Sequence, residues 1–591
     1  MTISISVGIA TGIGALLFYE GLKWAGRFFL SDLAGLALPF EGQELALLSQ
    51  WTPPGVPWLV LPVICLGGLL SGLLVYFLAP EAEGSGMDAA ISAFHGGSQM
   101  RARTPLLKAV TATLTISTGG SAGREGPMAQ ISAGLASIVA DLLNFSTRER
   151  RVALATALGA GTATIFTAPL GGAILAAEIL YMRDFESEAV VPAFLATIIG
   201  YAIFGMFEGF EPLFVTIAVS WELLHIPLFL LLGAVSALVG LLYIAVFFRT
   251  QDAFTRFFDV HRLPPYGKPV LGAFLAGLSV VGISLLAPEA SYLGVANLGV
   301  GYGFVQLALY NLLPLWVIVL LPFTKILLTS LTVGSGGSGG VFAPGLVIGA
   351  STGGAMGMLF HLAAPGLVSL ETVPAFVIVG MIALLGSVSK APIAVMIMVI
   401  EMTGDFSLLI PAMGAVSISY LICGEETIFR SQVLNRARSP AHRGEYRVEV
   451  LQEIRTAEAM VPAGEVLSLG PDDRCETMLA LVEQTSHTGF PVIENGRLIG
   501  IVSIGDVRGR EDAVEIPVVE VMTDQLITIH PSDSLEHALS LMITHDIHHL
   551  PVVSPEHPEV LLGFLTRTDI LKAYARAMAE EQERELFQPW W

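Results

Sequence analysis

Long apolar runs separated by short polar or glycine-rich breaks fill most of the chain up to about Arg438. Ile226–Phe248, Pro269–Leu286 and Leu408–Cys423 are examples, and a helix needs about 20 such residues to cross the hydrocarbon core of a bilayer. The pattern then changes to short apolar stretches and amphipathic segments in a polar background. These patterns predict a polytopic helical membrane domain over residues 1–440, followed by a soluble tail.

Two segments of the membrane domain, 217 positions apart, have nearly the same sequence. Leu114–Pro127 reads LTISTGGSAGREGP, and Leu331–Pro344 reads LTVGSGGSGGVFAP. Paired glycine-interrupted apolar segments in a membrane chain indicate two related halves that face a shared binding site near the middle of the bilayer. We place these halves at roughly 1–210 and 211–440.

Each repeat copy is followed by an Ala-Pro pair with a glutamate nine residues after the proline, namely Glu178 and Glu401. Because the two glutamates are related by the repeat, we expect them to share a structural role, such as accepting hydrogen bonds from a broken helix. A direct role in transport is the alternative, since acids inside membranes are often functional.

The soluble tail is itself a duplication, in which Gly500–Asp506 matches Gly563–Asp569. Each copy predicts a short strand, an amphipathic helix, a strand pair and a closing helix, which together form a small α/β unit. We place the two copies at residues 455–515 and 516–580.

Composition and charge agree with this division. Hydrophobic residues make up 53% of the 591 and charged residues 14%, against about 25% charged residues in soluble proteins. From Ala441 onward, 11 Lys and Arg face 26 Asp and Glu, and such an acidic tail argues against nucleic acid as a partner. Basic clusters at Arg148–Arg151 and Arg430–Arg443 flank apolar runs, so the positive-inside rule puts the tail in the cytoplasm.

Three glycine-rich breaks, Gly84–Gly86, Gly123–Pro127 and Gly339–Pro344, predict an anion site. The first N–H groups of a helix have no partner within it, and with the helix dipole they attract anions without a full basic charge. Irregular backbone inside a bilayer is tolerated where it lines a cavity. The alternative is that these glycines only allow close helix packing, but three breaks, two of them repeat-related, favour convergence on one halide-sized ion.

In this order and spacing, GSG at 84–86, GREGP at 123–127 and GVFAP at 340–344 resemble the anion-binding motifs of the CLC chloride channels and transporters. The two tail units resemble a pair of CBS domains, which follow the membrane domain in that family. The resemblance covers essentially the whole chain. It implies an inverted repeat of tilted, partly spanning helices, and a homodimer in which each subunit has its own anion pathway.

The resemblance assigns anion-binding positions to Ser85, Gly86, Arg124, Gly126, Val341, Phe342 and Phe429. It implies that the Ser85 hydroxyl and the N–H groups of Val341 and Phe342 bind the central anion, and that serine favours chloride. Glu125 matches the gating glutamate, whose carboxylate occupies the outer site until protonation removes its charge. From the residues alone, an acid in an apolar segment is a functional candidate. The alternative is a structural ion pair with Arg124, although adjacent residues of a helix point apart.

Three positions depart from the family pattern. Asp88 replaces a proline, and an acid near the inner mouth repels anions unless it is paired or points away. Ile179 replaces the second glutamate of members that exchange chloride for protons, and isoleucine cannot carry a proton. Phe429 replaces a tyrosine that donates to the central anion, so we expect weaker chloride binding by about 1.5–3 kcal/mol.

CBS pairs of the family often bind adenine nucleotides between the two copies. By resemblance, Asp506, Thr566 and Asp569 are candidate nucleotide-binding residues, and the acids would hold the ribose hydroxyls. The alternative for both acids is capping of the closing helix, worth about 1 kcal/mol. The histidine-rich segment His545–His549 could suggest a metal site, but we expect solvated histidines at a helix end.

We expect an integral protein of the bacterial inner (plasma) membrane that transports chloride, contacts membrane lipid, requires no cofactor and is not an enzyme. A gate at Glu125 and isoleucine at position 179 favour passive or loosely coupled chloride movement. A proton-coupled chloride antiporter with a different internal proton route is the alternative, and fluoride export stays open. A divalent-cation transporter with CBS domains would need clustered acids, whereas the glycine breaks offer N–H donors.

Overall fold

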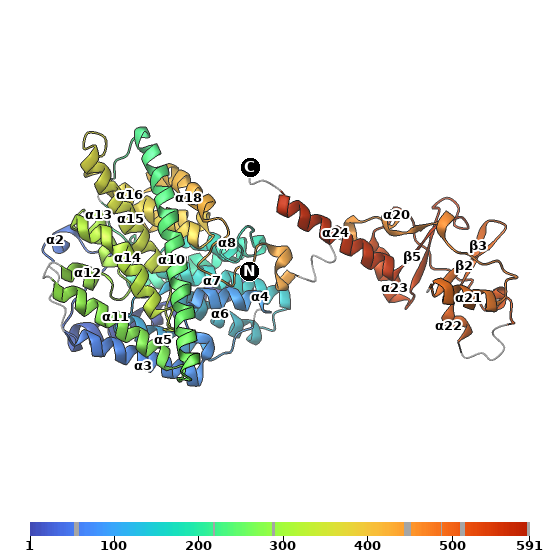
Figure 1. The fold of residues 1–591 in the computed structure, drawn as a ribbon, viewed down its shortest axis with the longest axis horizontal. Coiled ribbons are helices and arrows are strands. Elements are labelled where there is room, and N and C mark those ends of the chain that lie inside the picture. Colours follow the sequence, from blue (N-terminus) through green and yellow to red (C-terminus); the bar gives the residue numbers. More distant parts are fainter. Residues whose placement is uncertain are drawn as a thin grey trace. The chain divides into compact units, whose positions relative to one another are not determined.

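The computed structural model describes residues 1–51, 58–97, 99–216, 219–286, 290–442, 451–485, 487–508 and 515–587. It divides into two compact units, Met1–Ala441 and His442–Trp591 (Figure 1). Arg443, the end of the second predicted basic cluster, lies outside the described residues. Each unit is described by itself.

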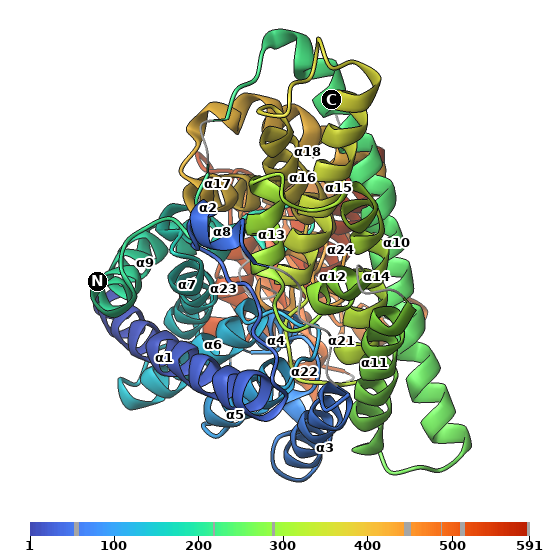
Figure 2. The ribbon, with the colours of Figure 1, turned by 90° about the vertical axis from the view of Figure 1, so that its left-hand side faces the viewer.

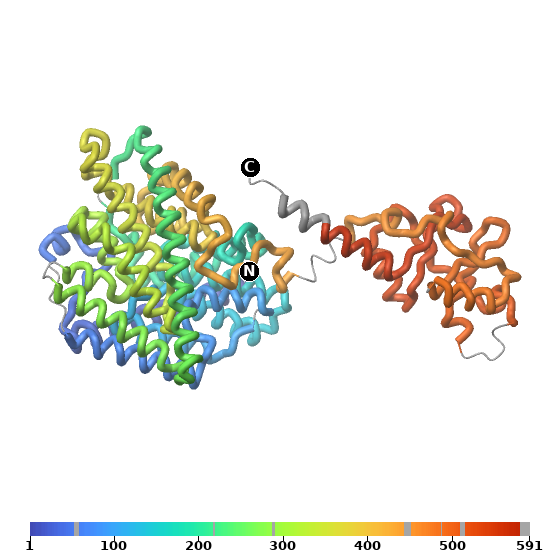
Figure 3. The backbone as a smooth tube through the Cα atoms, in the orientation of Figure 1, coloured from blue at the N-terminus to red at the C-terminus, as the bar shows by residue number. Residues whose placement is uncertain are grey.

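The first unit is helical. Its helices are α1 (Thr2–Gly26, continued by a π-helical turn over Arg27–Leu33), α2 (Leu45–Leu48), α3 (Val60–Leu78), α4 (Gly86–His95), α5 (Thr104–Ser117), α6 (Glu125–Leu142), α7 (Thr147–Phe166), α8 (Pro169–Glu178), α9 (Ser187–Glu208), α10 (Ile226–Val260), α11 (Gly267–Leu286), α12 (Ser291–Ala296), α13 (Tyr302–Leu309), α14 (Leu315–Thr332), α15 (Phe342–Ala363), α16 (Val373–Val388), α17 (Pro392–Thr403) and α18 (Leu409–Cys423). Eight helical segments of the described residues are long and apolar enough to cross a membrane. One of them contains α10, which runs the full height of this unit in Figure 3.

The two sequence repeats start and end helices at matching places. α6 begins at Glu125 and α15 at Phe342, directly after the two glycine-rich segments. α8 and α17 each begin at the proline of an Ala-Pro pair, where proline loses no helical hydrogen bond. Figure 2 shows the blue to cyan helices of the first half on the left and lower side, and the green to gold helices of the second half on the right and upper side.

The second unit contains two small sheets. Its elements are α20 (Thr456–Ala459), β1 (Val461–Pro462), α21 (Cys475–Thr485), β2 (Gly489–Glu494), β3 (Arg497–Ser503), α22 (Ile504–Val507), α23 (Leu535–Thr544), β4 (His549–Val553), β5 (Leu561–Thr566) and α24 (Arg567–Phe587). One sheet has the strand order β1-β5-β4, and the other pairs β2 with β3. The amphipathic helices predicted in the tail are α21 and α23, and each packs apolar residues on its own strand pair.

The segment that begins each copy pairs with the other copy, which the sequence pattern did not predict. β1 of the first copy runs antiparallel to β5 of the second, with Val461 opposite Phe564. The matching segment of the second copy forms a single bridge, Thr523 to Ile501 on β3, and not a strand. The exchange joins the two copies through backbone hydrogen bonds.

Candidate functional site

The three glycine-rich breaks of the helical unit meet at one point. Gly123 and Gly340 exchange two backbone hydrogen bonds, each 2.8 Å long. The N–H of Gly339 donates to the carbonyl of Gly84 at 3.2 Å, which ties the first break to the third. The predicted convergence of the breaks is therefore confirmed.

Close backbone contact explains why glycine is needed here. A Cβ atom on Gly86 would overlap the carbonyl of Gly126. A Cβ on Gly126 would lie 2.9 Å from the Cα of Gly340, and one on Gly340 would lie 2.9 Å from the nitrogen of Gly126. Side-chain rotation relieves none of these contacts, because both partners are backbone.

Helices α4, α6 and α15 all start at this meeting point. Their first N–H groups have no acceptor within the helix, so they form a cluster of donors with a net positive dipole. Ser85 is the residue before α4, yet its side chain does not cap the helix. Among the described residues, the buried Ser85 Oγ has no hydrogen-bond partner. A hydroxyl and several helix N-termini are thus available to a small anion.

Glu125 is fully buried at the start of α6. Its Oε1 accepts a 2.6 Å hydrogen bond from the hydroxyl of Tyr302 on α13. Its Oε2 has no partner within the described part of the chain. A Cβ on Gly123 would lie 2.6 Å from this Oε2 and 3.1 Å from the nitrogen of Ala343, which places the carboxylate beside the N-terminus of α15. The carboxylate therefore occupies a place that suits an anion.

Arg124 contacts Glu125, contrary to the expectation that the two neighbours point apart. Its Nε lies 3.7 Å from Glu125 Oε1. The expectation was wrong because the long Arg124 side chain, at the N-cap of α6, reaches the carboxylate although the backbone there is close to helical. The stronger partner of Arg124 is Glu41, at 2.7 Å from Nη1, and the guanidinium also packs over the rings of Tyr19 and Tyr302. Glu125 is therefore not the main counter-ion of Arg124.

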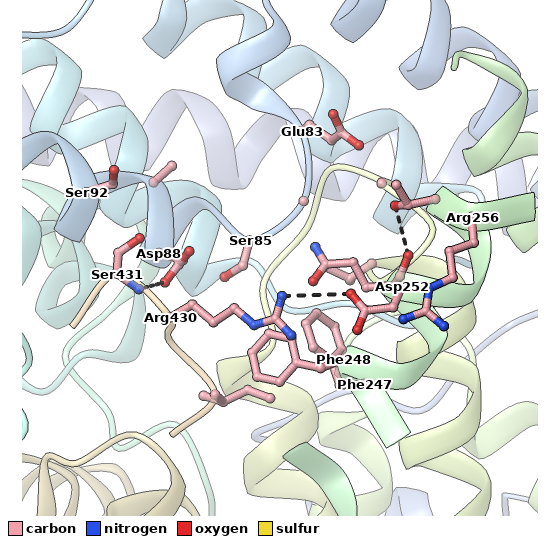
Figure 4. Close-up of a pocket in the computed structure, with 17 residues that line it drawn as sticks. Glu83, Ser85, Asp88, Ser92, Phe247, Phe248, Asp252, Arg256, Arg430 and Ser431 are labelled. Atoms are coloured by element: carbon pink, nitrogen blue, oxygen red, sulfur yellow. Dashed lines mark hydrogen bonds and ion pairs between the residues drawn. The ribbon is translucent and has the colours of Figure 1, made fainter. Parts of the chain in front are cut away.

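A cavity of about 710 Å³ opens beside Ser85 (Figure 4). Asp88 lines it and accepts a 2.9 Å hydrogen bond from the N–H of Ser431, so the acid is paired, one of the two conditions that the sequence analysis set. Arg430 also lines it, with its guanidinium over the Phe248 ring and 3.9 Å from Asp252. The cavity gives an anion a polar entrance with a guanidinium at its wall.

The other two departures from the family pattern are buried. Phe429 is fully buried between Ile428 and Arg430, which both line the cavity. Ile179 ends α8 and is fully buried, and its carbonyl accepts a 2.8 Å hydrogen bond from Gln432 Nε2.

Glu178 and Glu401 cap each other's helices across the repeat. Glu178 accepts from the N–H groups of Ile393 and Ala394 at the start of α17, at 3.2 and 2.7 Å. Glu401 accepts from Leu170 and Gly171 at the start of α8, at 3.0 and 2.7 Å. The predicted acceptance of hydrogen bonds from a broken helix is confirmed.

In the second unit, a cleft of about 380 Å³ lies between the two copies. Thr566 and Asp569 line it, while Asp506 is not among the described residues that do. Both acids cap their closing helices: Asp506 accepts from the N–H and hydroxyl of Ser503, and Asp569 does the same with Thr566. Capping therefore accounts for Asp506, whereas Asp569 also faces the cleft.

His549 corrects the expectation of solvated histidines. It lies on β4, lines the cleft and stacks on Phe564 with a centroid distance of 5.8 Å. Burial, together with the neighbouring imidazoles of His548 and His487, lowers the pKa of His549 to about 4. The ring is therefore neutral at pH 7 and acts as an apolar and hydrogen-bonding wall of the cleft.

Comparison with known proteins agrees with this geometry. The family model described as "Voltage gated chloride channel" matches residues 67–424. The chain belongs to the voltage-gated chloride channel (CLC) family. The CBS domain model matches residues 457–511 and 518–576. Membership in the CLC family places the protein among anion channels and transporters.

CLC relatives match over much or nearly all of the chain. Uncharacterized protein MJ0305 of Methanocaldococcus jannaschii is 30% identical over 411 residues, covering 69% of this chain and 95% of that protein. Chloride channel protein CLC-f of Arabidopsis thaliana is 27% identical and covers 96% of this chain and 69% of its own length. The crystal structure of a slow cyanobacterial Cl⁻/H⁺ antiporter has a TM-score of 0.60 at 26% identity, covering 73% of this chain and 96% of that one.

Sequence reasoning about the CLC site missed three residues. Lys108 is fully buried and donates to the carbonyls of Ala82 and Gly84, at 2.9 and 2.8 Å, which secures the first break. A lysine in the apolar run before the repeat was a signal that could have revealed it. Tyr302 and Glu41 lie far from the motifs in sequence, and no local pattern marks them.

Removal of the Glu178 carboxylate is expected to destabilise this CLC protein. Glu178→Ala leaves two N–H groups of α17 without this acceptor, and the one of Ala394 is buried, so we expect the free energy of unfolding in detergent to fall by about 1–3 kcal/mol. Glu178→Gln keeps one acceptor oxygen and should lose less. Thermal unfolding of the purified variants measures both effects. Unchanged stability with altered chloride flux would instead favour the transport role.

Proposed function

We propose that the protein moves chloride across the membrane passively or with loose coupling to protons, and that Glu125 gates the pathway. The observation that carries the proposal is the meeting of three helix starts around Ser85 Oγ and Glu125 Oε2, which have no hydrogen-bond partner among the residues that the structure describes. Peptide dipoles stabilise a partly dehydrated halide there. An ionised Glu125 competes with the halide for the outer anion position. Protonation removes the charge of Glu125, and its side chain then leaves that position.

Weak chloride binding at the central position fits this mechanism. Phe429 lacks the hydroxyl that the family's tyrosine supplies, which removes a bond worth about 1.5–3 kcal/mol to a charged group. The Tyr243 hydroxyl lies close by, but it donates to the carbonyl of Val341 at 3.0 Å. Sites that bind weakly favour throughput over occupancy.

Proton coupling is the second candidate, because the cyanobacterial relative of known structure is described as a Cl⁻/H⁺ antiporter. An antiporter needs an internal proton carrier, and Ile179 cannot serve as one. Exchange would therefore require a different route, such as water in the inner cavity beside Asp88.

A crossed-gradient measurement decides between the two candidates. In proteoliposomes with opposed chloride and pH gradients, we expect the reversal potential to follow the chloride gradient and chloride-driven proton uptake to be close to background. Proton uptake should be low because the buried Ile179 side chain cannot carry a proton. Stoichiometric proton uptake would show coupled exchange. Ile179→Glu is the matched variant, and it should raise proton uptake above that of the wild-type protein.

The cleft of the second unit is proposed to hold an adenine nucleotide. Aromatic Phe490 and Phe564 line it for stacking, Lys572 supplies a cation for phosphate, and Asp569 has one carboxylate oxygen beyond its capping bonds for a ribose hydroxyl. Nucleotide here would regulate transport, which itself requires no cofactor.

Asp569→Asn is expected to weaken binding of ATP or AMP to the full-length protein by about tenfold, the loss of one charged hydrogen bond. Isothermal titration in detergent measures the affinity. Asp506→Asn removes the matching cap of the other copy and is the control, expected to leave the affinity unchanged. Equal loss in both variants would show that capping alone matters.

The proposal includes a homodimer in a bacterial inner membrane, with the tail in the cytoplasm and lipid around the apolar helices. The site favours chloride over a divalent cation, because the converging loops present N–H donors and cations require oxygen ligands. Chloride-dependent thermal stabilisation, tested against magnesium and fluoride, checks the ion preference.

A further inference from the structure

A fourth glycine-containing break lies at Asn297–Gly301, and the repeat spacing of 217 relates it to Pro80–Gly84, the segment that leads into Ser85. Lys325 lies 217 positions after Lys108, which is the spacing of the repeat. Lys325 is fully buried, and its Nζ donates to the carbonyls of Asn297 and Gly299, at 3.4 and 3.2 Å. Each half of the membrane unit therefore contains a buried lysine, at matching positions of the repeat, that binds the carbonyls of such a loop.

The helix that follows this break carries Tyr302 at its first position. Gly301 has a φ of +91°, which glycine adopts without strain, and α13 starts at the next residue. The Tyr302 ring is 1% exposed and packs edge-on against Phe214 at 5.5 Å, with Phe166 at 6.5 Å. Packing on these sides fixes the orientation of the ring and therefore the direction of its hydroxyl.

The Tyr302 hydroxyl donates a hydrogen bond to Oε1 of Glu125, 2.6 Å away. The first-half loop presents Ser85 beside the inner cavity, while the second-half loop presents Tyr302 to the proposed gate. An inverted repeat accounts for the difference, because equivalent loops then approach the pathway from opposite sides.

We propose that Tyr302 is a positioning residue that holds ionised Glu125 in the outer part of the anion pathway, with Lys325 securing the loop that carries it. The inference rests on the proposed gating role of Glu125. The charged and titratable groups that face Glu125 are Arg124, Glu41 and Tyr302. Of these, Tyr302 alone donates a hydrogen bond of normal length to the carboxylate.

The hydroxyl sets the pH at which the gate opens. A donor stabilises the ionised carboxylate more than the neutral acid, so it favours the closed position. Without the Tyr302 hydroxyl, Glu125 takes up a proton at higher pH, and its side chain leaves the anion pathway at that higher pH.

The test is the pH profile of chloride efflux from liposomes that contain Tyr302→Phe. We expect the midpoint of activation to move to higher pH by about one to two pH units. Lys325→Met, which frees the loop, should move it in the same direction. The control is Tyr420→Phe on α18, which removes a 2.7 Å hydrogen bond to the Met182 carbonyl and should leave the midpoint unchanged.

The Glu125→Gln background separates this inference from the proposed function. In that background Tyr302→Phe should have no effect on the profile, because the titrating group is gone. An unchanged midpoint in Tyr302→Phe alone overturns the positioning role while leaving the gate intact. An effect of Tyr302→Phe that persists in the Glu125→Gln background also overturns it. If Glu125→Gln retains the wild-type pH profile, the gate itself fails.

Discussion

Replacement of Glu125 by glutamine is expected to abolish most of the pH dependence of chloride efflux. Glutamine has nearly the same size and can accept the Tyr302 hydrogen bond, but it carries no charge to compete with chloride beside α15. Efflux at neutral pH should rise by about tenfold, since a difference of about 1.4 kcal/mol suffices for that factor. Efflux from liposomes across a pH series measures both quantities.

Glu20→Gln is the matched control for this experiment. Glu20 is an exposed acid on α1, paired with Lys23 at 2.8 Å, and lies outside the proposed pathway. Its replacement should leave the pH profile as it is. A wild-type profile in Glu125→Gln would show that another group gates the pathway.

Replacement of Gly86 by alanine is expected to disrupt the anion site most strongly among single-methyl changes. The added Cβ overlaps the backbone carbonyl of Gly126, and the ring of contacts among the three breaks leaves neither loop free to move. We expect chloride flux to fall by more than about tenfold, with a loss of stability of about 1–3 kcal/mol, as for overpacked cores. Flux and thermal unfolding of the same preparation measure the two effects.

Gly282→Ala on α11 is the control, because nothing lies within 4 Å of a Cβ at that position. Alanine in an exposed helix interior should raise helix stability by up to about 1 kcal/mol and leave flux unchanged. Normal chloride flux in Gly86→Ala would show that moving the three glycine-rich breaks apart does not impair chloride transport.

Features that repeat along the chain could be predicted. The two glycine segments predicted that helices start after them, and the structure starts α6 at Glu125 and α15 at Phe342. The two Ala-Pro pairs marked a matching feature of the halves, and α8 and α17 begin at their prolines. Glycine and proline act on the backbone of their own segment, so their effect is visible without knowing the fold. The structural role of Glu178 and Glu401 followed from the same repeat.

Contacts between distant segments could not be predicted. Tyr302 lies 177 positions after Glu125, and Glu41 reaches Arg124 from the loop before α2. The contact between Arg124 and Glu125 was mispredicted, since the direction of the backbone was considered and the reach of a long guanidinium side chain was not. The pairing of each CBS copy's first segment with the other copy was also missed, because it depends on how two copies pack together.

By itself, the sequence determined the class of the protein: a repeated apolar domain with unpaired helix starts suited to an anion, and a duplicated acidic tail. Hydrophobic length and backbone chemistry are local properties, and residue order specifies them. Tertiary structure alone decided which groups surround Glu125 and which of the two CBS acids lines a cleft. Those outcomes depend on distances of a few ångströms between segments that only the packed repeats bring together.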